Sequence, residues 1–162
     1  HLMHTEESVL TYDANYKINP PLRTEEDRKA LVKGLIDDTI DAIVSAHSPH
    51  DEESKKLEFD KADFGISGLQ TLLPSLLSLR DEIEPKQWIG KLTSAPRQIL
   101  KVDASQIEEK EIANLTLFNP KSKWILNDST NHSKSRNSPY FNKELKGKVT
   151  AVFNNNQHQT FS

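Results

Sequence analysis

TEEDRKALVKGLIDDTIDAIVSAHSPH, residues 24–50, is the stretch that decides the fold class. Thr24 followed by three acidic residues is typical of a helix N-cap and its first turn. Apolar residues then recur on one face of the predicted helix, and the β-branched run Thr39–Ala46 lacks clean alternation, which predicts a strand covered on both faces. A helix, a short turn and a buried strand in succession indicate an α/β fold.

The segments after this stretch predict a loop and several helices. His47–Gly65 is long and charged, as expected of a functional loop at the C-terminal end of a strand. Ile66–Leu79 is strongly apolar and contains Pro74, which predicts a helix that kinks or restarts at the proline. Two further helices are expected over Pro85–Thr93 and Ala95–Lys101.

Beyond about Asp103 the pattern changes to short apolar runs separated by Asn, Asp, Ser and Pro, which predicts strands. These runs are Leu115–Phe118, Trp124–Leu126 and Val149–Phe153. The polar stretch Ser129–Lys146 is too long for a hairpin turn, and Asn154–Ser162 is expected to fray. We therefore expect two parts, residues 1–102 and a small β segment with a tail at 103–162.

The composition excludes several classes of function. The 162 residues are 35% hydrophobic and 28% charged, so part of the apolar surface is expected to lie against something outside this chain. A net charge of -3 with interleaved signs gives no basic face for nucleic acid, and no apolar run approaches the roughly 20 residues of a membrane span. Without cysteine, any metal would need His, Asp, Glu or a modified Lys, and a reducing cytoplasm is the expected compartment.

The motif His47-Ser48-Pro49-His50 directly follows the predicted strand. Two histidines three residues apart on a loop are able to ligate a metal or to bind an anionic substrate. Because a metal site needs three or more ligands, the spacing alone favours a solvent-exposed pair.

Taken together, the segments resemble the dihydroorotases of the long, bacterial type in order and spacing. The resemblance covers nearly all of the chain and rests on His1-Leu2, Tyr12–Arg23 with its Asn-Pro-Pro-Leu-Arg block, His47–His50, Phe64–Thr71 and Lys134–Tyr140. It implies a TIM-type (β/α)8 amidohydrolase barrel with a small β appendage domain, of which this chain would supply the end of strand seven, strand eight, the following helices and the C-terminal tail.

The resemblance also implies an activity. A dihydroorotase reversibly hydrolyses the cyclic amide of dihydroorotate to carbamoyl aspartate in pyrimidine biosynthesis, with a zinc-activated water as nucleophile and a strand-eight aspartate as metal ligand and general base. The family's other metal ligands lie on strands that are absent here. Zinc is therefore the family's cofactor, but none is expected to bind to this chain alone.

Four residues align with the family's substrate contacts. The resemblance implies that Asn19 contacts the substrate, that His50 helps bind its carboxylate, and that the backbone of Phe64 and Gly65 meets its ring. The prolines after Asn19 would hold it in an extended, rigid connection. An asparagine that satisfies loop backbone is an equally good interpretation of Asn19.

The chain departs from the family pattern at Ala46. Where the family has Asp-His-Ala-Pro-His, residues 46–50 read Ala-His-Ser-Pro-His, so no catalytic residue is intact. A methyl group neither ligates zinc nor accepts a proton. Asp41 faces the other side of the predicted strand and Asp51 lies beyond the loop, so neither is an obvious replacement. The chain alone is therefore predicted to be inactive.

Three functions remain open. The parent protein is a dihydroorotase acting on the small molecule dihydroorotate, expected as a homo-oligomer. Alternatively, it is a non-catalytic, dihydroorotase-like structural partner of aspartate transcarbamoylase, which the loss of the aspartate at position 46 favours. A third alternative is another cyclic-amide specificity, such as a hydantoinase or an allantoinase, because related sequence blocks occur in that wider group.

Overall fold

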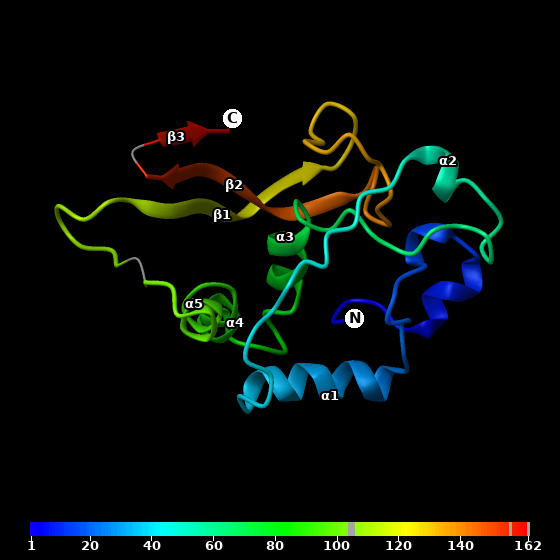
Figure 1. The fold of residues 1–162 in the computed structure, drawn as a ribbon, viewed down its shortest axis with the longest axis horizontal. Coiled ribbons are helices and arrows are strands. Elements are labelled where there is room, and N and C mark those ends of the chain that lie inside the picture. Colours follow the sequence, from blue (N-terminus) through cyan, green and yellow to red (C-terminus); the bar gives the residue numbers. More distant parts are fainter. Residues whose placement is uncertain (104–105, 156, 162) are drawn as a thin grey trace.

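The computed structural model contains a three-stranded antiparallel sheet and a set of short helices (Figure 1). It describes residues 1–103, 106–155 and 157–161. In chain order the elements are the 3-10 helices η1 (Glu6–Thr11) and η2 (Ala14–Tyr16), the helices α1 (Glu25–Ile36), α2 (Glu52–Lys55), α3 (Leu72–Ser78), α4 (Pro85–Leu92) and α5 (Ser94–Leu100), and the strands β1 (Asn114–Ile125), β2 (Glu144–Asn154) and β3 (Gln157–Thr160).

Helix α1 begins where the sequence predicts it. The Thr24 hydroxyl oxygen accepts a hydrogen bond from the Asp27 N–H (3.2 Å), and the Asp27 carboxylate accepts one from the Thr24 N–H (3.2 Å). This capping box satisfies two backbone groups that the start of a helix leaves unpaired. Helices α4 and α5 confirm the other two predicted helices to within one residue at each end.

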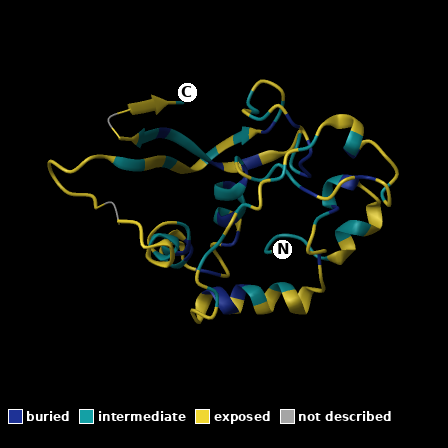
Figure 2. Cartoon of the chain, in the orientation of Figure 1, coloured by how far each residue is buried: buried dark blue, intermediate teal, exposed yellow. Residues whose placement is uncertain are grey.

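The core lies between α1, α3 and α4 and consists of large apolar side chains. Trp88 is 1% exposed, and it packs with Leu35, Leu76, Leu79 and Ile83. Helix α3 also packs against β2, so the helices and the sheet meet along this helix (Figures 1 and 2). None of the helices in the described part of the chain has the length and apolar character needed to cross a membrane.

The predicted buried strand over Thr39–Ala46 is wrong for this structure. The segment forms no strand, and Val44 is 78% exposed. A strand covered on both faces needs hydrogen-bonding neighbours along its edges. Among the described residues, the segment pairs with no strand: the Ile40 N–H donates to the Gly34 carbonyl (2.8 Å), the Ile43 N–H donates to the Lys91 carbonyl (3.0 Å), and a single parallel bridge joins His47 to Ile66. A β-branched sequence without edge partners does not form a strand.

The helix predicted to start at Ile66 instead starts at Leu72, so Pro74 opens a helix and does not kink one. Proline is tolerated in the first turn because the N–H that it lacks has no partner there. Extending the helix further upstream would bring the proline ring against the carbonyl four residues earlier. The residues from Ile66 to Thr71 are therefore free to run beside the His47 loop.

The sheet merges two predicted strands into β1. Strands β1 and β2 pair antiparallel from Asn114 opposite Asn154 to Ile125 opposite Glu144, with register shifts that include the stretch around Pro120. Proline cannot donate to the ladder, and the irregularity accommodates it. The tail was expected to fray, but Gln157–Thr160 pairs with β2 as β3. The connection between β1 and β2 is a long loop, as predicted.

His4 ties the N-terminal segment to the β1–β2 connection. Its Nε2 lies 2.9 Å from the Tyr140 hydroxyl, and its ring meets that of Tyr16 edge-on with centroids 5.1 Å apart. Burial, as the largest cause, together with nearby positive charge that includes Lys143, lowers the pKa of His4 from 6.5 to about 4. The folded state therefore binds this proton less well than the unfolded state. The stability contributed by neutral His4 is present above its unfolded pKa and is lost as pH falls through about 4.

We expect the melting temperature to fall between about pH 7 and about pH 4, and to fall less in His4→Gln, which cannot take up the proton. Thermal unfolding followed by circular dichroism across this range checks the difference. His158→Gln, which changes an exposed histidine on β3, serves as the control and should follow the wild type. Identical pH profiles for the wild type and His4→Gln would contradict the role given to His4.

Candidate functional site

His50 is held by groups on both of its ring nitrogens. Its Nε2 lies 3.0 Å from the Phe64 carbonyl oxygen and 3.2 Å from the Ser48 hydroxyl, and its Nδ1 lies 3.5 Å from the Asp63 carboxylate. A ring nitrogen that bonds a carbonyl oxygen must carry a proton, so Nε2 is a donor. The side chain is 26% exposed, which leaves part of the ring accessible to a ligand.

Gly65 lies against this ring and requires the absence of a side chain. Its φ is +146°, and a Cβ there would lie 2.7 Å from the Ser48 Cβ and 3.0 Å from the His50 Cδ2. A glycine suits such a close approach of backbone to a side chain. Gly65 therefore packs too closely against Ser48 and His50 to carry a side chain.

The backbone of Phe64 and Gly65 is largely engaged within the chain. The Gly65 N–H donates to the Lys17 carbonyl (2.9 Å), and the Gly65 carbonyl accepts from the side chains of Lys55 and Asn137. The Phe64 N–H has no hydrogen-bond partner among the described residues. The phenyl ring of Phe64 is exposed and lies 4.6 Å from the Lys17 ammonium. The donor that this turn leaves free for a ligand is the Phe64 N–H.

Asn137, in the connection between β1 and β2, forms hydrogen bonds to both the His50 loop and the Gly65 turn. The Asn137 side chain is buried; its Nδ2 donates to the carbonyls of Ser48 (3.0 Å) and Gly65 (3.1 Å), and its Oδ1 accepts from the His50 N–H (3.3 Å). The Ser135 hydroxyl lies 2.5 Å from the His50 carbonyl oxygen. Both loops of the site are therefore fixed from the same segment.

Lys55 is a buried cation beside the site. Its ammonium donates to the carbonyls of Ala14 (2.6 Å), Asp63 (2.8 Å) and Gly65 (3.1 Å). Burial, and next the neighbouring charge of Lys17, lower the pKa of Lys55. A neutral amine has only two N–H groups, so all three carbonyls are satisfied together only by the ammonium.

The remaining predicted residues lie nearby but are less engaged. Asn19 is exposed and makes no side-chain hydrogen bond within the described ranges, although the backbone two residues before it bonds Gly65. His47 is exposed, and its Nδ1 accepts from the Leu69 N–H at 3.3 Å. His47 and His50 therefore bond different partners.

Ala46 opens the two-histidine loop with a left-handed backbone, at a φ of +45°, and its side chain is exposed. No three His, Cys, Asp or Glu side chains gather into a metal-binding group in the part of the chain that the structure describes. The residues described here therefore do not fit the zinc that the family implies.

Sequence reasoning missed the residues that hold the site together. Asn137 and Ser135 lie in a block that the family resemblance includes, but their role was not predicted. Lys55 lies in a charged stretch in which a surface lysine is the ordinary expectation. Asn137 could have been identified from its place in the Lys134–Tyr140 block, which the family resemblance includes. A polar residue that is shared with the family but lies outside the predicted pocket is expected to form hydrogen bonds elsewhere in the protein.

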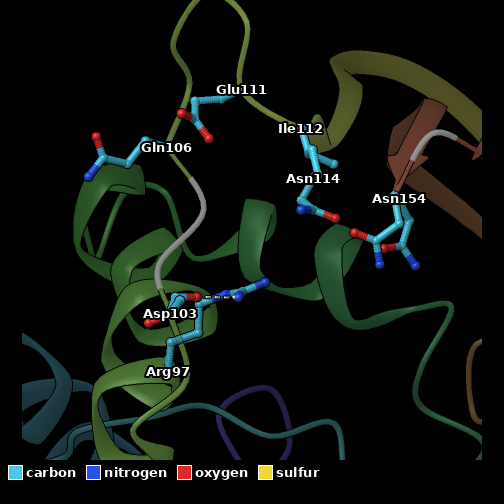
Figure 3. A pocket seen from close by; sticks show the side chains of 8 residues that line it. Arg97, Asp103, Gln106, Glu111, Ile112, Asn114 and Asn154 are labelled. Carbon is cyan, nitrogen blue, oxygen red and sulfur yellow. Dashed lines mark hydrogen bonds between the residues drawn. The ribbon is translucent and has the colours of Figure 1, made fainter.

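A separate hollow of about 720 Å³ lies between α5 and the start of β1 (Figure 3). Its lining residues are Arg97, Asp103, Gln106, Glu111, Ile112, Asn114, Asn154 and Asn155. The Arg97 guanidinium donates to the Asp103 carbonyl at 2.8 Å, and Figure 3 shows it extending toward the asparagines. None of the predicted site residues lines this hollow, so the candidate site is the one around His50.

We predict that Gly65→Ala destabilises the protein by roughly 1–3 kcal/mol, because the added Cβ overlaps the Ser48 Cβ and the positive φ disfavours a side chain. Gly90→Ala is the matched control. It lies in α4, where a Cβ would approach nothing closer than 3.8 Å, and it should be neutral or slightly stabilising. Urea unfolding of the two variants checks both signs. Equal effects of the two substitutions would show that Gly65 is not tightly packed.

No protein-family model matches the chain. Curated relatives do. The dihydroorotase of Aquifex aeolicus is 46% identical over 152 residues, which cover 92% of this chain and 36% of that protein. The dihydroorotase of Ehrlichia canis is 41% identical over 151 residues, covering 92% of this chain and 34% of that protein. The chain thus spans about a third of the length of these relatives.

Solved structures show the same fold. The L-hydantoinase (dihydropyrimidinase) from Arthrobacter aurescens superposes with a TM-score of 0.86 at 19% identity, covering 99% of this chain and 39% of that one. A dihydroorotase from Campylobacter jejuni superposes with a TM-score of 0.70 at 15% identity, covering 93% and 42%. The predicted fold class, a C-terminal portion of a TIM-type amidohydrolase barrel with a small sheet, is confirmed. By sequence, this chain is similar to dihydroorotases over nearly all of its own length and about a third of theirs, and by fold it is similar to a hydantoinase.

Proposed function

We propose that the whole protein binds the cyclic amide dihydroorotate at the His50 site but hydrolyses it far more slowly than its catalytic relatives. The relatives that cover nearly all of this chain are named dihydroorotase, which supports the substrate class. In that protein, residues 1–102 would belong to the barrel and residues 103–162 to the β appendage. A soluble, cytoplasmic homo-oligomer is the corresponding expectation for the assembled protein.

Binding is assigned to four residues. His50 is partly exposed, so its ring is accessible to the carboxylate of the ligand. The exposed Phe64 ring offers an apolar face and its N–H a free donor, while Gly65 lets the turn approach closely. Asn19, exposed and without a side-chain partner in the described chain, is free to reach a polar group of the ligand.

The single observation that carries the slow hydrolysis is Ala46. This residue stands where the family has its general base, and its methyl group is exposed at the start of the histidine loop. Loss of a general base alone slows a reaction by roughly 10²–10⁴-fold. We assign no catalytic step to any residue of this chain.

The same observation favours a second candidate, a structural partner of aspartate transcarbamoylase without catalytic activity. A protein kept for assembly has no need of a carboxylate at position 46. The exposed side chains of Val44 and Leu69 are apolar surface that a larger assembly could cover. A hydantoinase- or allantoinase-type specificity is the remaining alternative for the binding site.

Hydrolysis and binding by the whole protein test the proposal. We expect calorimetric titration to detect dihydroorotate binding, and ring opening to be slow in the wild type and faster by roughly 10²–10⁴-fold in Ala46→Asp. Ser45→Asp, which places a carboxylate one residue earlier, is the matched control and should gain nothing. Bound zinc is measured in each sample.

Three results would count against the proposal. Wild-type turnover equal to that of the Aquifex aeolicus enzyme, assayed alongside, would overturn the slow hydrolysis. Failure of Ala46→Asp to gain activity despite bound zinc would show that position 46 is not where the base belongs. Absence of dihydroorotate binding, with co-elution with aspartate transcarbamoylase, would favour the structural-partner role.

A further inference from the structure

Lys55, the buried lysine of α2, donates hydrogen bonds to backbone carbonyls of the candidate site. Helix α2 has four residues, and of these Lys55 is the buried one, at 8% exposed. Its three carbonyl acceptors come from three places in the chain: η2, the end of the charged loop, and the Gly65 turn. Taking a charge out of water is costly unless its donors are used. Here every donor of the ammonium is used.

Lys55 bonds the two peptide groups that flank the Phe64–Gly65 peptide. It bonds the carbonyls of Asp63 and Gly65, and the Phe64 carbonyl between them accepts from the His50 Nε2. The orientation of the Phe64–Gly65 segment is therefore set on one side by Lys55 and on the other by His50. The free Phe64 N–H belongs to the first of these peptides.

A buried apolar side chain could not replace this arrangement. Without the ammonium, the Asp63 carbonyl would lose its donor among the described residues, while Ala14 would keep only the Lys17 N–H and Gly65 only Asn137. Unpaired carbonyls in a buried turn seek water or other donors, which changes the orientation of the peptides. The geometry of the ligand site therefore depends on a residue that does not face the ligand.

We propose that Lys55 is a positioning residue, whose ammonium fixes the Phe64–Gly65 turn against His50 and thereby sets the affinity of the site for a cyclic amide. This inference rests on the proposed function for the identity of the ligand. The part of the inference that concerns structure, that Lys55 fixes the Phe64–Gly65 turn, does not depend on the identity of any ligand.

The test compares four variants of the whole protein. Lys55→Met removes the charge and keeps a side chain of similar length, and Lys55→Arg keeps a cationic donor. Lys56→Met changes the exposed neighbour, which pairs with Glu52. Lys91→Met removes another buried lysine, one that pairs with Asp38 in the helical layer away from the site. The probe is dihydroorotate, with its dissociation constant measured by calorimetric titration and the melting temperature measured alongside.

We expect Lys55→Met to weaken dihydroorotate binding roughly tenfold or more, and Lys55→Arg to recover part of the loss. Lys56→Met and Lys91→Met should bind within about twofold of the wild type, even though Lys91→Met lowers the melting temperature. If Lys55→Met binds like the wild type, or if Lys91→Met weakens binding as much as Lys55→Met, a positioning role is excluded.

A ligand-free measurement separates this proposal from the proposed function. Amide hydrogen exchange at Gly65, whose N–H donates to Lys17, should accelerate roughly tenfold or more in Lys55→Met and stay unchanged in Lys91→Met. The Arg28 amide, which donates to the Thr24 carbonyl in the first turn of α1, is the internal reference. If the wild type fails to bind dihydroorotate, the proposed function fails, and exchange at Gly65 still decides whether Lys55 fixes the turn. Unchanged exchange at Gly65 in Lys55→Met would overturn the inference.

Discussion

The side-chain amide of Asn137 is the interaction on which the rest of the candidate site depends. It is 4% exposed, donates to the carbonyls of Ser48 and Gly65, and accepts from the His50 N–H. Leaving a buried polar group unpaired costs roughly 1–3 kcal/mol, so a fully satisfied amide strongly favours one arrangement of its partners. One side chain therefore ties the loop that carries His50 to the turn that carries Gly65.

These contacts are long-range, and they make the site a product of the whole chain. Asn137 is separated from Ser48 by 89 residues and from Gly65 by 72. The β1–β2 connection, whose sequence resembles a polar linker, thus completes a candidate site whose proposed ligand-binding groups come from earlier loops. The Gly65 carbonyl links the β1–β2 connection to the earlier loops because it accepts hydrogen bonds from both Asn137 and Lys55. At the start of the histidine loop, where the proposed function expects a carboxylate, this chain has the methyl group of Ala46.

Elements with a local cause were predictable from the sequence. The capping box at Thr24 starts α1, and the helices after Pro85 follow their apolar spacing. The strand expected over Thr39–Ala46 does not form because no neighbouring strand pairs with it among the described residues, a condition that no local pattern contains. The candidate site shows the same difference between local and long-range causes. Ala46 and the two-histidine loop could be identified by their sequence pattern, whereas the burial of Lys55 and Asn137 depends on carbonyls supplied by distant segments.

The most direct test of this account is the free energy of unfolding of Asn137→Asp in the whole protein. The substitution keeps the shape of the side chain but replaces the donor that faces the Ser48 and Gly65 carbonyls with an acceptor. We expect a loss of about 3 kcal/mol or more, since a buried carboxylate would face two carbonyl oxygens. Asn155→Asp, at an exposed turn, is the matched control. A loss below about 0.5 kcal/mol, no larger than that of the control, would contradict the central role of Asn137.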